Sequence, residues 1–161
     1  MSLGKPPREI PRQSSLALCA PLFTAAVDEV MQKMNADGFP SVVIETLRTT
    51  ERQEFLYGFS RLYDDGRGEV TKSRTALHSW HGYGLAADIV HASRYWSATE
   101  EYWKHLEETA NAFGLKTGRK WKKPDRPHVF WGKCRKTPSP RARQLLASGG
   151  MVAVWQEVGA I

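Results

Sequence analysis

The chain has 161 residues, of which 41% are hydrophobic and 25% are charged, as is typical of one soluble globular domain with a core that needs no disulfides. It contains two cysteines, Cys19 and Cys134, and they lack the paired spacing of a zinc ribbon. No apolar run is long enough to cross a membrane. A disulfide framework, a zinc ribbon and a transmembrane protein are therefore excluded, and both cysteines are expected to be small apolar residues.

The first half of the chain predicts an arm, two helices and a strand between them. Residues 1–14 are polar and contain proline, and they are expected to form a flexible arm. A helix is expected from Pro21 to Asn35, because proline suits a first helical turn and the apolar residues recur on one face. Residues 41–47 are rich in β-branched side chains and predict a strand, and residues 51–63 predict a helix. The polar stretch from 67 to 77 is expected to be a loop over the site.

The second half predicts alternating strands and helices. The expected elements are a strand from 85 to 90, a helix from Ser97 or Thr99 to Phe113, a basic loop from 116 to 126, a strand that begins at His128, and a short helical tail from about 138 to 161. In the tail, a helix from Ser139 to Ala147 is expected to end at Gly149 and Gly150. Residues 15–161 are thus predicted to form a single α+β domain, with a small, mainly antiparallel sheet and surrounding helices.

Residues 78–88 contain the pattern Ser-x-His-x-x-Gly-x-Ala-x-Asp, in which the histidine is His81 and the aspartate is Asp88. On one helix these two residues would lie about 10 Å apart, and on a straight strand they would lie on opposite faces, so neither element lets them share an ion. A turn between them is required, and Gly82 and Gly84 permit one. An aspartate in the apolar strand that follows is costly to bury unless it is paired or bound to a metal.

A second cluster, from Asp125 to His128, supplies another carboxylate and another imidazole. Pro127 excludes a helix interior and favours extended backbone, so Asp125 is expected on the loop just before the strand that begins at His128. Two histidines and an aspartate suit Zn²⁺ with one position left for water, and a further carboxylate can handle a proton. The two clusters therefore predict one zinc ion per chain and a hydrolytic site.

The histidines must be weighed against simpler structural roles. Any single histidine is more often a satisfied core residue than a ligand, and Asp-x-x-His alone is a weak signal. The complete five-position pattern should arise by chance only about once per million starting positions. His91, just past its strand, and His105, on the outer side of its helix, are expected to be structural. His78 neighbours the site but is not expected to be a ligand.

On these residues the chain resembles the M15 zinc peptidases. That family includes D-alanyl-D-alanine carboxypeptidases, D-alanyl-D-alanine dipeptidases and L-alanyl-D-glutamate endopeptidases, and its fold is shared with the signalling domain of hedgehog proteins. The segment from Ile44 to Gln53 is similar to the family's strand, Tyr-Arg-Ser and helix with Gln, and the resemblance covers about residues 18–132. It implies that His81, Asp88 and His128 are zinc ligands and that Asp125 is the general base. It also implies that Arg48 stabilises the oxyanion and that Ser79 and Gln53 contact the substrate.

The sequence departs from the family pattern at three positions. The base is aspartate where glutamate is more frequent, although aspartate is familiar among phage endopeptidases. Leu47 replaces an aromatic residue, and Val129 stands where phenylalanine usually follows the last histidine. None of these changes removes a reacting group, so they bear on substrate preference.

The resemblance implies a hedgehog/D-Ala-D-Ala-peptidase-like fold and a zinc metallopeptidase that cleaves the stem peptides of bacterial peptidoglycan. The favoured bond is L-alanyl-D-glutamate, as in a phage-type endolysin; the alternatives are a D-alanyl-D-alanine carboxypeptidase and a catalytically silent, metal-containing binding module. The presence of both Asp125 and Arg48 argues against the binding module. We expect a monomer that stays in the cytoplasm until it is released to the cell wall, or an exported or periplasmic protein if a leader has been removed.

Positive charge is concentrated between Lys116 and Arg143, a stretch with eleven Lys and Arg and one acid, Asp125. The remainder of the chain carries 12 basic and 16 acidic residues. This distribution favours a positive rim that attracts an anionic polymer such as peptidoglycan, and a plain solvated surface is the simpler alternative. No nucleic-acid motif accompanies the basic stretch, so no nucleic-acid partner is expected.

Overall fold

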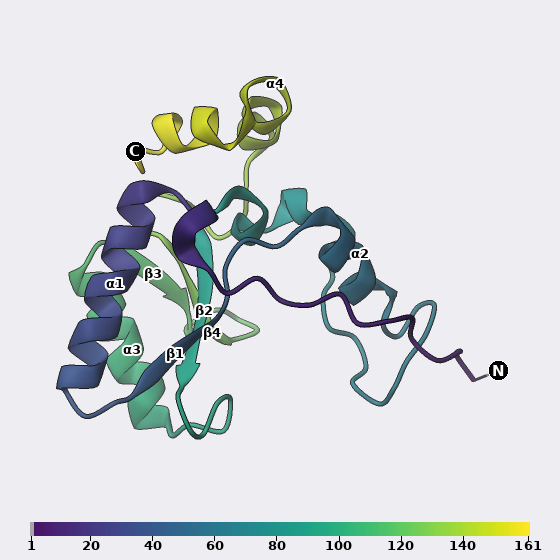
Figure 1. The fold of residues 1–161 in the computed structure, drawn as a ribbon, viewed down its shortest axis with the longest axis horizontal. Helices are drawn as coiled ribbons and strands as arrows, with labels where there is room; N and C mark the ends of the chain where they lie inside the picture. Colours follow the sequence, from purple (N-terminus) through teal and green to yellow (C-terminus); the bar gives the residue numbers. More distant parts are fainter. Residues whose placement is uncertain (1) are drawn as a thin grey trace.

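The computed structural model describes residues 2–161, and Figure 1 shows a small central sheet with helices around it. Within these residues the α-helices are α1 (Pro21–Ala36), α2 (Thr50–Gly58), α3 (Glu100–Ala112) and α4 (Pro140–Glu157), and the strands are β1 (Ser41–Glu45), β2 (Ala86–His91), β3 (Leu115–Gly118) and β4 (Asp125–Trp131). Short 3-10 helices are η1 (Leu16–Leu18), η2 (Ala76–His78) and η3 (Trp80–Tyr83). The predicted α+β fold with a small antiparallel sheet is confirmed.

The four strands lie in the order β1-β2-β4-β3, and each neighbouring pair is antiparallel. In the central pair, Asp88 on β2 lies opposite His128 on β4, and Ala87 lies opposite Val129. Because side chains alternate along a strand, Asp88 and His128 share one face of the sheet while Ala87 and Val129 share the other. The sheet register alone therefore brings together two polar residues that are far apart in the sequence.

Helices α1 and α3 lie side by side against the sheet, and α2 lies on the opposite side of the strands (Figure 1). The buried residues of α1 and α3 recur at helical spacing, as the sequence predicts for an apolar stripe; they are Phe23, Val27, Val30 and Met34 in α1, and Tyr102, Trp103, Leu106 and Ala110 among those in α3. The Thr99 hydroxyl caps α3 by accepting a hydrogen bond from the backbone N–H of Tyr102. These two helices form the main core and leave the other side of the sheet for the site.

Helix α2 is shorter than the predicted helix from 51 to 63. It ends at Gly58, whose carbonyl accepts hydrogen bonds from the backbone N–H groups of Arg61 and Tyr63. The chain closes a tight turn there, and Ser60 adopts a left-handed backbone with a φ of 66°. The Tyr63 ring packs so closely on Gly58 that a β-carbon at that position would overlap it. The close contact with this ring, in the turn that follows directly, marks the end of α2.

Two predicted boundaries in the second half are also wrong. The segment 116–126, predicted as a loop, contains most of β3 and the start of β4, which pair as a hairpin. Asp125 is consequently the first residue of β4 and not a loop residue. In α4, by contrast, the helical backbone breaks at Gly150, where φ is 72° and ψ is −173°, as predicted for the two glycines. A second helical segment follows this kink and continues to Glu157.

The predicted N-terminal arm, described from residue 2 to residue 14, runs beside α2 and reaches the start of the domain (Figure 1). The Gln13 carbonyl accepts a hydrogen bond of 2.7 Å from the backbone N–H of Thr46. The Ile10 carbonyl accepts one from the side chain of Arg52. The arm is thus connected to two segments that carry the site, while Met1 lies outside the described residues.

The two cysteines behave as small apolar core residues. Both are free and buried, and burial raises the pKa of the Cys19 thiol to about 11 and that of Cys134 to about 12. Neutral thiols of this kind are poor nucleophiles and poor metal ligands. Across residues 2–161, we find no helix that combines the length and apolar character needed to cross a membrane.

Candidate metal centre and catalytic pocket

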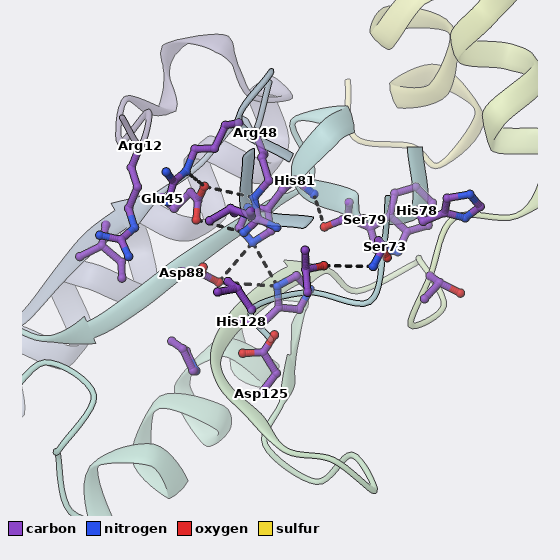
Figure 2. Close-up of a pocket in the computed structure, with 18 of the residues that line it drawn as sticks. Arg12, Glu45, Arg48, Ser73, His78, Ser79, His81, Asp88, Asp125 and His128 are labelled. Atoms are coloured by element: carbon purple, nitrogen blue, oxygen red, sulfur yellow. Dashed lines mark hydrogen bonds and ion pairs between the residues drawn. The ribbon is translucent and has the colours of Figure 1, made fainter. Parts of the chain in front are cut away.

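Three side chains from η3, β2 and β4 converge in one pocket (Figure 2). His81 Nε2 lies 3.2 Å from Asp88 Oδ1, and His128 Nδ1 lies 3.3 Å from His81 Nε2 and 3.6 Å from Asp88 Oδ1. Ligand atoms bound at about 2.0–2.2 Å to a tetrahedral zinc ion lie about 3.3–3.6 Å from one another. The triangle therefore has the dimensions of three zinc ligands, and the structure brings together the set predicted from the sequence.

The turn that carries His81 depends on two glycines. Helix η3 begins after Ser79, whose hydroxyl accepts a hydrogen bond from the His81 backbone N–H, and it ends at Gly84 with a left-handed φ of 68°. A β-carbon on Gly84 would press against the backbone of η1, and one on Gly82 would overlap the carbonyl oxygen of Ala76. The turn predicted after this histidine is thus a tight 3-10 turn that requires glycine at both positions.

The hydrogen bonding of His81 leaves one ring nitrogen free to bind a cation. Its Nδ1 lies 2.8 Å from the backbone oxygen of Thr46, which can only accept, so Nδ1 carries the proton and Nε2 offers a lone pair. That lone pair faces the Asp88 carboxylate at 3.2 Å. Two lone pairs this close repel each other unless a proton or a metal ion lies between them. The arrangement fits a cation held by both groups.

The surroundings of Asp88 and His128 also suit both residues to bind a cation. Burial opposes ionisation of Asp88, but the neighbouring His81 and His128 outweigh burial and hold the pKa of Asp88 well below its usual value. Asp88 is therefore a carboxylate at neutral pH, which metal binding requires. The His128 ring is packed between Trp121 and Phe130, with centroid separations of 5.4 Å to each. This packing fixes the direction in which the His128 ring points.

Asp125 lies beside His128 in the same pocket, while Arg48 enters from the opposite side (Figure 2). Asp125 keeps contact with solvent, yet its carboxyl group lies among pocket side chains. This local burial raises the pKa of Asp125, and the negative charge of Asp88 adds to the effect. A carboxylate with a raised pKa holds a proton more readily, which is the property that a general base requires.

Arg48 is held by a buried carboxylate that the sequence analysis did not single out. Glu45 is 3% exposed and accepts hydrogen bonds from Arg48 Nε at 3.1 Å and Nη2 at 3.0 Å, and from Arg52 Nε at 2.9 Å. Burial opposes ionisation of Glu45, but the bonds from Arg48 outweigh it and lower the pKa of Glu45. The two-point contact fixes the plane of the Arg48 guanidinium. An acid at the end of a β-branched strand was the available signal, because such an acid needs a partner.

Gln53, predicted to contact the substrate, does not reach the pocket surface. It is fully buried, and its side-chain oxygen accepts a hydrogen bond of 3.1 Å from Arg48 Nη1. Its amide donates to Thr71 Oγ1 at 3.2 Å and to the Ser73 carbonyl at 2.6 Å. Gln53 therefore connects Arg48 to the loop over the pocket. Ser79 does line the pocket, and its hydroxyl also caps η3.

The remaining histidines lie outside the ligand cluster. His91 is the last residue of β2, and its Nδ1 accepts hydrogen bonds from the backbone N–H groups of Ser93 and Arg94, a structural role as predicted. His105 on α3 is half-buried. Its Nε2 lies 2.8 Å from Asp37 Oδ2, and its ring stacks on that of Phe39. His78 is exposed and points away from the cluster (Figure 2).

Comparison with known proteins agrees with this geometry. Residues 72–131 match the model of an M15 peptidase family described as D-alanyl-D-alanine carboxypeptidase. The fold is similar to the L-Ala D-Glu endopeptidase ChiX of Serratia marcescens, at 20% identity over 77% of this chain and 91% of that one, with a TM-score of 0.52. The vancomycin-resistance D,D-pentapeptidase VanY from a VanB-type cassette, solved as a mutant with Zn(II), is 16% identical over 96% and 97% of the two chains, with a TM-score of 0.49. No curated protein gave a significant match.

The matched segment contains His81, Asp88, Asp125 and His128, which are the residues that the fold gathers in the pocket. Residues 72–131 of the chain are thus similar to the M15 peptidases. The expected hedgehog/D-Ala-D-Ala-peptidase-like fold is confirmed by the likeness to ChiX.

Replacing Glu45 with glutamine is expected to destabilise the protein strongly. The neutral amide cannot compensate the positive charges of the two largely buried guanidinium groups of Arg48 and Arg52. Removing one partner of a buried ion pair typically lowers the free energy of unfolding by about 3–5 kcal/mol. Glu69→Gln is the matched control, because it removes the carboxylate that pairs with Arg61 at the exposed surface and should cost less than about 1 kcal/mol. Urea unfolding at pH 7 measures both values.

The Glu45→Gln defect should also shrink in acid. The pKa of Glu45 is lowered in the folded protein, so its stabilising effect is present above the ordinary value of 4.5 and is lost as the pH falls through the lowered folded value. A defect equal to that of Glu69→Gln, or one that stays constant into acid, would contradict this account of Glu45.

Proposed function

We propose that this protein is a zinc-dependent peptidase that cleaves the stem peptides of peptidoglycan, at the bond between L-alanine and D-glutamate. The observation that carries the proposal is the triangle of His81, Asp88 and His128 with Asp125 and Arg48 in one pocket. A hedgehog-like module that only binds would need no residue with the properties of Asp125. The raised pKa of Asp125 beside a ligand cluster supports catalysis.

His81, Asp88 and His128 would hold one zinc ion, which when bound lowers the pKa of water and polarises a carbonyl. Asp125 accepts the proton of the attacking water and returns it to the nitrogen of the leaving amine, so that water is added across the peptide bond. The raised pKa of Asp125 suits both transfers. The position of each group in the pocket supports the role proposed for it.

Arg48 is assigned to the negative charge that develops on the scissile carbonyl oxygen. Three of its five N–H groups are used by Glu45 and Gln53, which leaves two to face the pocket. Because these neighbours fix the guanidinium before substrate arrives, little reorganisation is needed during the reaction. Ser79 remains the proposed substrate contact at the pocket wall.

The shape of the pocket supports cleavage inside a chain. It merges with one neighbouring hollow through Trp96, Asp125 and Pro127, and with another through Ser73, His78 and Thr137. A groove that continues past the reacting groups on both sides suits a peptide that runs on in both directions. The family description favours removal of a terminal D-alanine as the second candidate.

Elemental analysis should find about one zinc per chain, and His81→Ala should lose most of it, because two remaining protein ligands hold the ion poorly. His105→Ala is the matched control, since it also breaks a histidine–aspartate contact but lies outside the pocket. Its zinc content should equal that of the wild-type protein. Full zinc retention in His81→Ala would exclude His81 as a ligand.

Asp125→Asn should keep the fold and the zinc but lose turnover by about 10²- to 10⁴-fold, because an amide of similar size cannot accept the proton. Asp65→Asn, which changes an exposed acid paired with Arg67, should leave turnover unchanged. If Asp125→Asn lost its zinc instead, Asp125 would be a ligand, and the assigned roles of the carboxylates would have to be revised.

Digestion of purified peptidoglycan identifies the bond. Cleavage between L-alanine and D-glutamate should produce new amino groups on D-glutamate, which labelling and mass analysis detect. Release of free D-alanine with the L-alanyl-D-glutamate bond intact would favour the carboxypeptidase. The Asp125→Asn protein serves as the blank for both products.

A further inference from the structure

A second hollow adjoins the catalytic pocket between the loop after α2 and the start of α4. Lys72, Arg74 and Thr75 line it from the loop, and Arg143 lines it from α4. Its volume of about 570 Å³ is within the usual range for a small-molecule site. We call it the basic hollow, because its lining contains no aspartate or glutamate.

The positive charge in the basic hollow is uncompensated. Among residues 2–161, no carboxylate lies within 4 Å of the charged groups of Lys72, Arg74 or Arg143, and Arg143 donates instead to the Pro138 carbonyl at 3.1 Å. Three like charges around one concavity raise the local potential and attract anions.

Part of the basic stretch from 116 to 143 is neutralised by acidic partners. Arg119 and Arg126 both pair with Glu100, Lys120 pairs with Glu107, and Arg141 pairs with Glu157. The sequence predicted a positive rim along the entire stretch from 116 to 143. In the structure, glutamates of α3 pair with part of that charge. The charges around the basic hollow have no acidic partner among residues 2–161.

One polar group in the wall of the hollow also lacks a partner. The Thr75 hydroxyl is buried and makes no hydrogen bond with any group among residues 2–161. Leaving a buried hydroxyl unsatisfied typically costs about 1–3 kcal/mol. Thr75 is among the residues that line the hollow beside the three cations.

The basic hollow is part of the same groove as the reacting groups. Ser73, His78 and Thr137 line both the hollow and the catalytic pocket. Gln53 binds the Ser73 carbonyl and Arg48 at the same time, so the loop that carries Lys72 and Arg74 is tied to the site. A ligand group in the hollow would therefore lie next to the pocket that contains the reacting groups.

We propose that the basic hollow is a subsite for a carboxylate-bearing residue of the substrate peptide, next to the scissile bond. This inference rests on the proposed function, and it adds the requirement that the substrate be anionic on the side that faces α4. Guanidinium and ammonium groups bind carboxylates through charge-assisted hydrogen bonds. The contact is made in the ground state and in the transition state alike, so it strengthens substrate binding without changing the chemical step.

The test compares two probes and two pairs of substitutions. The probes are a soluble disaccharide-peptide from peptidoglycan with its carboxyl groups free, and the same compound with those groups converted to amides. Calorimetry with the zinc-loaded Asp125→Asn protein measures Kd while turnover is slow. Lys72→Gln combined with Arg74→Gln is compared with Lys122→Gln combined with Lys123→Gln, which removes the same charge from exposed residues of the β3–β4 connection.

The free-carboxylate probe should bind about tenfold more tightly than the amide, and the Lys72→Gln/Arg74→Gln protein should lose about that factor for the free-carboxylate probe only. Arg143→Gln, from the opposite wall, should act in the same way. With peptidoglycan as substrate, these variants should raise KM and keep kcat. The Lys122→Gln/Lys123→Gln protein should match its parent in every measurement.

Equal Kd values for the two probes, or equal losses in the two double variants, would overturn the subsite. Competition by a phosphate-bearing wall polymer, but not by the free-carboxylate probe, would overturn it in favour of a phosphate site. These outcomes are separate from a failure of the proposed function, because zinc content and cleavage products are measured independently. A protein that releases D-alanine can still show the predicted difference in binding.

Discussion

The site depends on the antiparallel pairing that sets Asp88 opposite His128. This register places a carboxylate and an imidazole on the same face of the sheet at the spacing that a metal ion requires. The third donor comes from a 3-10 turn, and the backbone of Thr46 fixes its tautomer by binding the other ring nitrogen. Two strands and a glycine-dependent turn thus supply the three donors.

Around this triangle, a buried network holds the other reacting group in place. Glu45 binds Arg48 and Arg52 together, and Gln53 binds Arg48 and the loop over the pocket. A single buried carboxylate thus connects β1 to α2 and to the proposed oxyanion donor. The loop, the arginine and the strand therefore share one set of hydrogen bonds, so a change at Glu45 would affect both the stability of the fold and the preparation of the site.

The positions of charged residues in the sequence do not show where positive charge gathers in the folded protein. The chain carries a net charge of +6, and the sequence concentrates it between Lys116 and Arg143. The fold pairs part of this stretch with glutamates of α3, and it gathers Arg143 with Lys72 and Arg74 from a distant loop. Several charges of the basic stretch are thus neutralised, while Arg143 joins two charges that are remote in sequence to form the basic hollow.

The sequence by itself determined what is local. The apolar stripes of α1 and α3, the two glycines after His81 and the spacing of the zinc-ligand set are recorded within short segments, so periodicity, backbone freedom and coordination chemistry predict them. Only the tertiary structure decided that α2 ends at Gly58, that Asp125 begins β4, that Gln53 is buried and that Glu45 joins two arginines. These features depend on which side chains and strands meet in the folded chain, such as the Tyr63 ring against Gly58 and the β3–β4 pairing. The propensity of each residue does not predict such contacts, because their free energy arises only when the two surfaces meet.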